Sequence, residues 1–368
     1  MRYPKFLPRG GTIGFLAPSF GCNIEPYRTA FNHAAEKWQG MGYRTVFGPN
    51  CYAGEGIGIS NTPEKCGGEV MEMFLSGDSD CLISCGGGEL MCEILPYVDF
   101  RKLADAEPKW YMGYSDNTNL TYLLATLADT ASVYGPCAPS FGMEPWHEAL
   151  WDAFGILTGR DATEGKSERA GDGQGSYEKT SAGHGAVVHG YEMWEKESLK
   201  SEENPLAPYN LTEKRSIRSY LGRESVSGEL HFQGRLLGGC LDCLVNLLGT
   251  RFDRTREFVE RYREDGIIWF LEACDLNVFA TRRGLWQMEE AGWLSHVKGF
   301  LIGRPANGEA MMGLDAYGAV LEVAGRKNVP VILDVDLGHL PPMMPLVVGS
   351  MADVAVNGND IRIEMRYV

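Results

Sequence analysis

The chain has 368 residues, which is more than one ordinary compact core accommodates and indicates two domains of unequal length or one domain with a large insertion. Its composition, with 44% hydrophobic and 23% charged residues, is typical of a globular protein and argues against a disordered chain. The net charge of −15 argues against nucleic acid as the main partner, because an acidic surface repels phosphate backbones.

The ten cysteines show no disulfide-like spacing, and the first residues do not resemble a secretion signal, so we expect a cytoplasmic protein. No apolar run reaches the ~20 residues that a membrane span needs, so no membrane partner is expected. Cys240 and Cys243 form an isolated CxxC pair without the further ligands of a zinc site. We therefore expect them to pack in the core, and we expect no metal.

Residues 1–140 alternate short apolar runs with helical patterns, which is typical of βαβ units and a parallel sheet. The expected strands cover residues 12–18, 44–47, 80–84 and 110–113, and the expected helices cover residues 26–39 and 63–75. The last two strands run into Cys85-Gly86-Gly87-Gly88 and Ser115-Asp116-Asn117. Both turns therefore lie at carboxyl ends of strands, where open α/β sheets bind their ligands.

Residues 141–233 are richer in Gly, Ser, Glu and Lys with isolated aromatics, and we expect a substrate-facing insertion or linker whose fold the pattern does not define. A second α/β pattern occupies residues 234–368 and forms a C-terminal domain. Its expected helices cover residues 240–248, 280–291 and 314–324, its expected strands cover residues 267–271, 297–302 and 331–333, and residues 353–365 are expected to end the fold as strands.

Ser115 is the candidate nucleophile, because it lies at a sharp junction between a strand and a helix. The surrounding sequence Gly-Tyr-Ser-Asp-Asn lacks the second glycine of the G-x-S-x-G motif. Serine needs a base within hydrogen-bonding reach, and the base needs a third group that fixes its tautomer. The alternative is that Ser115 and Asp116 only cap the following helix, since both residue types are preferred N-caps.

The glycine loop 86–88 allows close backbone approach and suits amides that point at an anion. If the two strand ends are neighbours, the amides of Gly87 and Asp116 would form an oxyanion hole. A phosphate loop is the competing interpretation, but neither a P-loop nor a dinucleotide-binding glycine motif is present.

His339 is the candidate base, because it lies in a rigid Gly- and Pro-bounded loop directly after a strand. Glu272 ends the apolar run 267–271 and can accept a hydrogen bond from an imidazole. Asp275 and Asp334 are rivals for that task. The plain alternative is that Glu272 caps the next helix or pairs with Arg282.

In their order and spacing these motifs resemble the LD-carboxypeptidase family of serine peptidases, which includes the microcin C self-immunity peptidases. The similar segments include the glycine loop with its LPYVDF continuation, Gly113-Tyr114-Ser115-Asp116, Phe270-Leu271-Glu272 and Gly338-His339. The resemblance implies that Ser115 attacks, that His339 transfers the proton and that Glu272 orients His339. It also implies that the amides of Gly87 and Asp116 hold the oxyanion.

The resemblance further implies a Rossmann-like N-terminal domain with a parallel sheet and a smaller C-terminal domain of swivelling β/α type. A cleft between the two domains, a homodimer and no metal or organic cofactor are also implied. The implied substrate is a murein L,D-tetrapeptide or an aminoacyl nucleotide of the microcin C kind, bound near Gly86 and Gly88. Trp194 is a candidate to stack on it, as are Trp146 and Trp151.

Two alternatives come from other classes of protein. An α/β-hydrolase esterase shares the chain order serine, acid, histidine, but the missing second glycine and the two-domain layout count against it. A non-catalytic protein that binds a peptide or nucleotide between its domains would not require the three residue types together.

Overall fold

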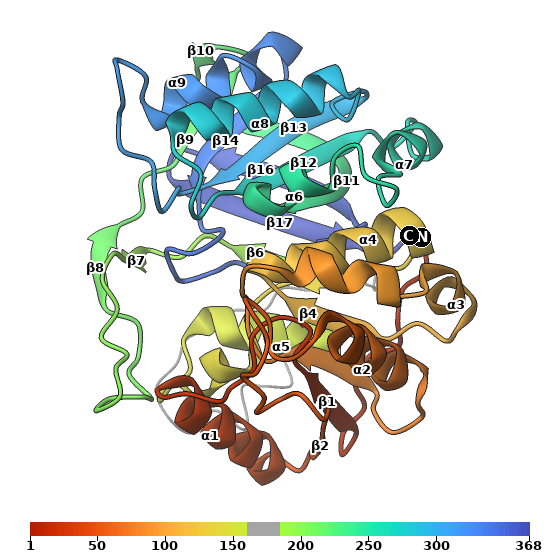
Figure 1. Ribbon diagram of the computed structural model, residues 1–368. Coiled ribbons are helices and arrows are strands. Elements are labelled where there is room, and N and C mark those ends of the chain that lie inside the picture. Colours follow the sequence, from red (N-terminus) through yellow and green to blue (C-terminus); the bar gives the residue numbers. More distant parts are fainter. Residues whose placement is uncertain (160–184) are drawn as a thin grey trace.

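The computed structural model describes residues 1–159 and 185–368, which form two α/β halves stacked one above the other (Figure 1). The N-terminal half contains a six-stranded sheet in the order β15-β5-β4-β3-β1-β2. Its strands are β1 (Thr12–Leu16), β2 (Arg44–Phe47), β3 (Cys81–Ser84), β4 (Trp110–Gly113), β5 (Ser132–Tyr134) and β15 (Leu346–Val348). The first five are parallel, and β15 pairs antiparallel with β5.

The helices of this half are amphipathic or wholly buried, as a parallel sheet covered on its faces requires. They are α1 (Tyr27–Gly40), α2 (Pro63–Leu75), α3 (Phe100–Asp105), α4 (Thr118–Ala128) and α5 (Glu148–Thr158), with 3₁₀ turns η1 (Met91–Tyr97), η2 (Ser115–Asn117) and η3 (Ala138–Gly142). Local caps define some helix starts. The Thr62 side chain accepts a hydrogen bond from the amide of Lys65 at the start of α2, and Asp99 accepts from Arg101 and Lys102 at the start of α3.

The C-terminal half contains a nine-stranded mixed sheet in the order β10-β9-β14-β13-β12-β11-β16-β17-β6. Its strands are β6 (Gly185–His189), β9 (Arg218–Leu221), β10 (Glu224–Ser225), β11 (Leu230–Cys240), β12 (Ile267–Glu272), β13 (Val297–Gly303), β14 (Pro330–Val335), β16 (Met351–Asn357) and β17 (Asp360–Arg366). Strands β11 to β14 are parallel to one another. Its helices are α6 (Leu241–Leu247), α7 (Thr255–Arg261), α8 (Val278–Glu290) and α9 (Ala316–Leu321), followed by η4 (Ala324–Lys327).

These halves bear out the expected α/β class, with a parallel N-terminal sheet and a separate C-terminal domain. Three strands of the segment 141–233, namely β6, β9 and β10, join the C-terminal sheet, and α5 also lies in this segment. A separate hairpin of β7 (Met193–Glu195) and β8 (Leu211–Lys214) projects to one side (Figure 1). The expected helix over residues 314–324 is shorter: α9 covers only Ala316–Leu321, because Leu314 forms a β-bridge with Met311 and the separate turn η4 begins at Ala324.

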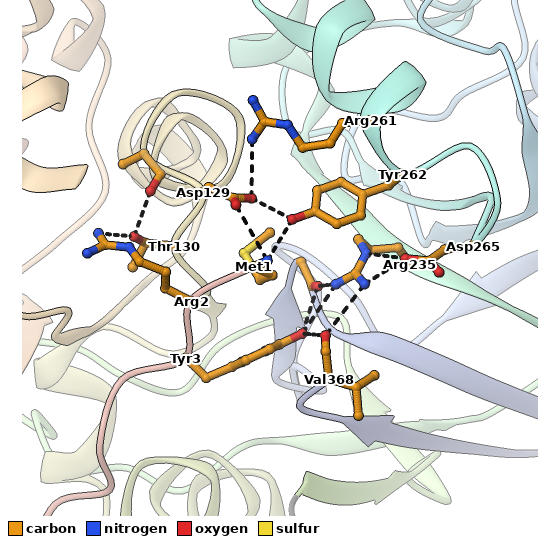
Figure 2. Close-up of polar contacts among 12 residues, drawn as sticks. Met1, Arg2, Tyr3, Asp129, Thr130, Arg235, Arg261, Tyr262, Asp265 and Val368 are labelled. Atoms are coloured by element: carbon orange, nitrogen blue, oxygen red, sulfur yellow. Dashed lines mark hydrogen bonds and ion pairs between the residues drawn. The ribbon is translucent and has the colours of Figure 1, made fainter. Parts of the chain in front are cut away.

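The first and last residues of the chain lie side by side where the two halves meet (Figure 2). The Tyr262 hydroxyl donates to Asp129 at 2.6 Å and so links the end of α7 to the end of α4. The Tyr3 hydroxyl contacts the Val368 carbonyl oxygen at 3.1 Å, and Arg235 forms an ion pair with Asp265 at 2.6 Å. This polar cluster fixes one edge of the junction.

Within the two described ranges, no helix combines the length and the apolar character that a bilayer crossing requires.

Candidate active site

Ser115 follows β4 directly and has a backbone φ of 62°, a left-handed conformation that is uncommon for a residue with a side chain. Such strain is characteristic of nucleophile elbows, where the turn projects the hydroxyl above the sheet. Asn117 stands where the second glycine of G-x-S-x-G would be, and its amide group donates to the Gly86 and Tyr114 carbonyls at 2.8 and 2.9 Å. The elbow is therefore held by a side chain instead of a second glycine.

His339 lies in the loop between β14 and β15, and its Nε2 is 2.9 Å from the Ser115 Oγ. Its Nδ1 is 2.9 Å from Oε2 of Glu272, the last residue of β12. The Glu272 side chain is almost fully buried, and the ring of Tyr114 packs against the imidazole with centroids 5.2 Å apart. The three residues chosen from the sequence therefore form one continuous hydrogen-bonded chain.

The surroundings of His339 favour its protonated form, the imidazolium. Burial lowers the pKa of His339, but the carboxylate of Glu272 and the neighbouring Cys274 raise it more, so that the net pKa lies above the ordinary value of histidine. Neither rival carboxylate is the partner of His339 Nδ1: Asp334 accepts from the Tyr317 hydroxyl at 2.9 Å, and Asp275 lines the cleft but the hydrogen bond to the imidazole comes from Glu272.

The glycine loop lies against the elbow. A Cβ added to Gly87 would lie 3.1 Å from the Ser115 Oγ, and one added to Gly88 would lie 2.3 Å from the Ser19 Oγ. The amide of Phe20 donates to the Gly87 carbonyl at 2.9 Å and fixes the loop on that side. A side chain at position 87 would press on the Ser115 hydroxyl and one at position 88 on the Ser19 hydroxyl, which explains why both residues are glycines.

Asp116 follows the candidate nucleophile, and its carboxylate is buried among donors. It accepts from the Ser19 hydroxyl at 2.6 Å, the Met91 amide at 2.9 Å and the Asn119 side chain at 3.0 Å. Burial raises the pKa of Asp116, while these hydrogen bonds lower it in part. The side chain thus anchors the backbone next to Ser115 and does not point its charge at the hydroxyl.

Tyr134, the last residue of β5, is a site residue that the sequence did not reveal. Its hydroxyl donates to Oε1 of Glu272 at 2.6 Å and accepts from the Ser115 amide at 3.1 Å. Burial and the adjacent Glu272 raise the pKa of Tyr134, so the phenol keeps its proton. The only available signal was a polar aromatic residue at the carboxyl end of a short strand.

A cleft of about 830 Å³ opens over Ser115 and is lined by residues of both halves, including the loop 86–88 and His339. Gly86, Gly87, Gly88 and Asp116 all line it, whereas Trp194 is not among its described lining residues. Trp194 lies on β7 with the Arg304 guanidinium 5.0 Å from its ring centre. Trp146 packs against Phe141 and Trp151.

Both cysteines of the CxxC pair were expected to pack in the core, but only one of them does so. Cys240 is buried, whereas Cys243 is half-buried and lines the cleft with its Sγ 3.7 Å from the Ser115 carbonyl oxygen. Between them, Asp242 accepts amide hydrogen bonds from Cys274 and Leu276 at 3.1 Å each and holds the loop that follows Glu272. Among the described residues, no group of three or more acidic, His or Cys side chains is arranged to hold a metal ion.

Comparison with known proteins gives matches to both halves of the chain. The LD-carboxypeptidase N-terminal domain matches residues 13–135, and the LD-carboxypeptidase C-terminal domain matches residues 233–354. The microcin C7 self-immunity protein MccF of Escherichia coli is 24% identical over 363 residues, which cover 98% of this chain and 94% of that protein. A putative carboxypeptidase of Vibrio cholerae is 23% identical over 378 residues, which cover 100% of this chain and 99% of that protein.

Among solved structures, MccF in complex with glutamyl sulfamoyl guanosine aligns with a TM-score of 0.75 and 23% identity over 99% of this chain and 98% of that one. The muramoyltetrapeptide carboxypeptidase of Oxalobacter formigenes aligns with a TM-score of 0.64 and 18% identity over 97% and 99% of the two chains. At these identities the structural matches establish the fold.

The two-domain fold and the paired domain matches define a serine peptidase. This chain belongs to the LD-carboxypeptidase family, whose two domains together match most of its length. Membership favours a peptidase over the α/β-hydrolase esterase and the non-catalytic binding protein considered from the sequence.

Proposed function

We propose that the chain is a serine carboxypeptidase or amidohydrolase that works through Ser115, His339 and Glu272. The observation that supports this proposal most directly is the unbroken chain of two 2.9 Å hydrogen bonds from the strained Ser115 through His339 to buried Glu272. In the neutral form of His339, Nδ1–H donates to Glu272 and Nε2 is free to accept the serine proton, so this form is the active one.

The reaction then has two stages. Ser115 Oγ attacks the carbonyl carbon while its proton moves to His339, and Glu272 stabilises the imidazolium that forms. The amides of Gly87 and Asp116 stabilise the oxyanion, and His339 returns the proton to the leaving amine as the acyl-enzyme forms. Water attacks this ester with the same base, which releases the acid and regenerates Ser115.

Two substrate classes follow from the relatives. One is a murein L,D-tetrapeptide, as the name of the Oxalobacter enzyme suggests, and the other is an aminoacyl nucleotide like the sulfamoyl conjugates seen with MccF. A cleft of about 830 Å³ is large enough for either class.

Mass spectrometry of two parallel digests tests the proposal, one with a murein L,D-tetrapeptide and one with an aminoacyl-sulfamoyl adenosine. We expect one of them to be cleaved, and we expect Ser115→Ala to lower turnover by about 10⁴-fold or more while circular dichroism stays unchanged. Release of D-alanine would indicate a cell-wall substrate, and cleavage of the conjugate would indicate an immunity-type role. Turnover that persists in folded Ser115→Ala would reject Ser115 as the nucleophile.

A further inference from the structure

The space around His339 has two unequal parts. The large cleft contains Ser115, and a smaller pocket of about 160 Å³ lies against Gly338, His339 and Pro341. Tyr114 and His339 line both, so the two parts adjoin at the imidazole. The small pocket is well below the size of a typical site for a drug-sized ligand and fits a single small residue.

Lys200 lines the small pocket and is only partly exposed. Burial lowers the pKa of its ammonium group, while the charge of Glu195 raises it in part. Glu195 accepts a hydrogen bond from the Asn210 amide. Among the residues that the structure describes, none forms a hydrogen bond or an ion pair with the Lys200 ammonium. Partly desolvated ammonium groups without a partner are costly, and a cleft that contains one is suited to an anionic ligand.

Charge is distributed unevenly between the two parts. The acidic residues Glu89 and Asp275 are part of the described lining of the large cleft, which includes no Lys or Arg. Asp116 and Asp242 also line it, but their carboxylates are held by hydrogen bonds from the protein. The small pocket is lined by Lys200 and by the buried Glu195, so Lys200 is the only Lys or Arg among the described residues that line the two parts. A carboxylate on a substrate is therefore repelled from the large cleft and attracted to Lys200. Since the leaving amine must receive its proton from His339, the small pocket beside the imidazole lies on the leaving-group side of the scissile bond.

We propose that Lys200 binds the free carboxylate of the terminal residue that the enzyme releases, and that it thereby selects substrates cleaved next to their carboxyl end. This inference rests on the proposed function, because it assigns the leaving-group side from the role of His339. Lys200 contacts the substrate and takes no part in proton transfer. A residue with an amidated carboxyl group loses the charge that Lys200 pairs with and so binds less well.

Protection of Ser115 against a fluorophosphonate probe tests the proposal, with D-alanine and D-alaninamide as competing ligands. We expect the wild type to need about tenfold to hundredfold less D-alanine than D-alaninamide for half-protection, as a charge-assisted contact provides. In Lys200→Met this ratio should fall to about one, while Lys196→Met, which changes an exposed lysine of the same segment, should keep the wild-type ratio.

A ratio that is the same in the wild type and Lys200→Met, or that is already about one in the wild type, would overturn the carboxylate subsite. Failure of the probe to label Ser115 would instead reject the proposed nucleophile. In that event the shift in melting temperature of the wild type and Lys200→Met with D-alanine and D-alaninamide decides the subsite. A shift specific to D-alanine that is lost in the variant supports it, and equal shifts refute it.

Discussion

Tyr134 connects two members of the Ser115–His339–Glu272 chain that lie on different halves of the molecule. Its hydroxyl holds the Glu272 oxygen that His339 does not use, and it also holds the amide of the strained Ser115. A single phenol thus fixes the direction of the Glu272 carboxylate and the backbone of Ser115. Tyr134 is not among the described residues that line the cleft, so it acts as a positioning residue.

Tyr134→Phe should lower kcat roughly tenfold and leave KM unchanged, because it removes one buried hydrogen bond without altering the substrate cleft. Without the phenol, the Glu272 charge is less stabilised and attracts the imidazolium more strongly. The pKa of His339, already raised by Glu272, should rise further, so the acid limb of the rate profile should move to higher pH. Because the pKa of His339 is raised to about 11, steady-state kinetics from neutral to alkaline pH measure both effects.

Tyr122→Phe is the matched control, because Tyr122 is also a buried tyrosine but bonds to Thr255, away from the cleft. Tyr122→Phe should lower the free energy of unfolding by a similar amount and should leave the acid limb of the rate profile at the wild-type pH. An acid limb that does not move in Tyr134→Phe, together with an unchanged kcat, would show that Tyr134 has no positioning role.

The candidate site was predictable where a residue with a reactive side chain also lay at or near the end of a predicted strand. Ser115 follows a strand, Glu272 ends one and His339 lies in a loop after one. All three have polar side chains suited to catalysis, and the structure places them within hydrogen-bonding distance. Tyr134 and Lys200 gave no such signal, because a tyrosine in a strand and a lysine in a polar segment are ordinary in sequence. Only the tertiary fold shows that the Tyr134 hydroxyl faces Glu272 and that Lys200 forms no ion pair with any residue that the structure describes.

At the level of elements, β11 passes unusually close to its neighbours. Gly238 has a φ of 156°, and a Cβ added there would lie 1.7 Å from the Phe270 carbonyl oxygen on β12. The next residue, Gly239, would place a Cβ 2.7 Å from the Thr118 side chain at the start of α4. The adjacent Cys240 amide donates to the Thr118 hydroxyl at 2.9 Å, so this contact joins the two halves directly beneath the cleft.

Gly238→Ala should therefore destabilise the fold by about 3 kcal/mol or more, because the obstructing atom belongs to a backbone that cannot move freely. Urea denaturation followed by circular dichroism measures the change in the free energy of unfolding. Gly228→Ala is the control, since nothing lies within 4 Å of the added Cβ there, and it should change stability little. Equal stability of the two variants would contradict the close approach of β11 and β12.

Most of the parallel strands and the long helices were readable from apolar runs and helical periodicity, but the long strand β11 was not predicted. Strand β5 was missed because it has only three residues, and β15 because its pairing partner lies far away in the sequence. Strand β6 was hidden in a polar segment, since it pairs only with β17 and has just two buried residues, Val187 and Val188. Propensity does not reveal elements that are specified by distant partners.

For the whole molecule, α4 is the structural link between the halves (Figure 1). Nearly all of its residues are buried, and it packs against β5 of one sheet and β11 of the other, as well as against α6 and α7. Its polar residues are buried as well as its apolar ones, so the helix lies in the interior with no face given to solvent. Neither half can therefore retain its core when the other unfolds.

Calorimetry should consequently show a single cooperative transition, with equal calorimetric and van't Hoff enthalpies, despite the two sheets. Two resolved transitions would mean that α4 remains folded with one half alone. The same scan of Tyr122→Phe should shift the transition to lower temperature without splitting it, because Tyr122 contacts Thr255 of α7 across the junction.

Strand β15 has a consequence for the newly made protein. It completes the edge of the N-terminal sheet by pairing with β5, yet it is synthesised long after that sheet's other strands. The loop with His339 precedes it directly, so both become available together. During translation the N-terminal half should carry an unpaired β5 edge and a serine without its base until residues 339–348 leave the ribosome. On the proposed mechanism, hydrolytic activity is therefore withheld from the nascent chain until residues 339–348 have been made.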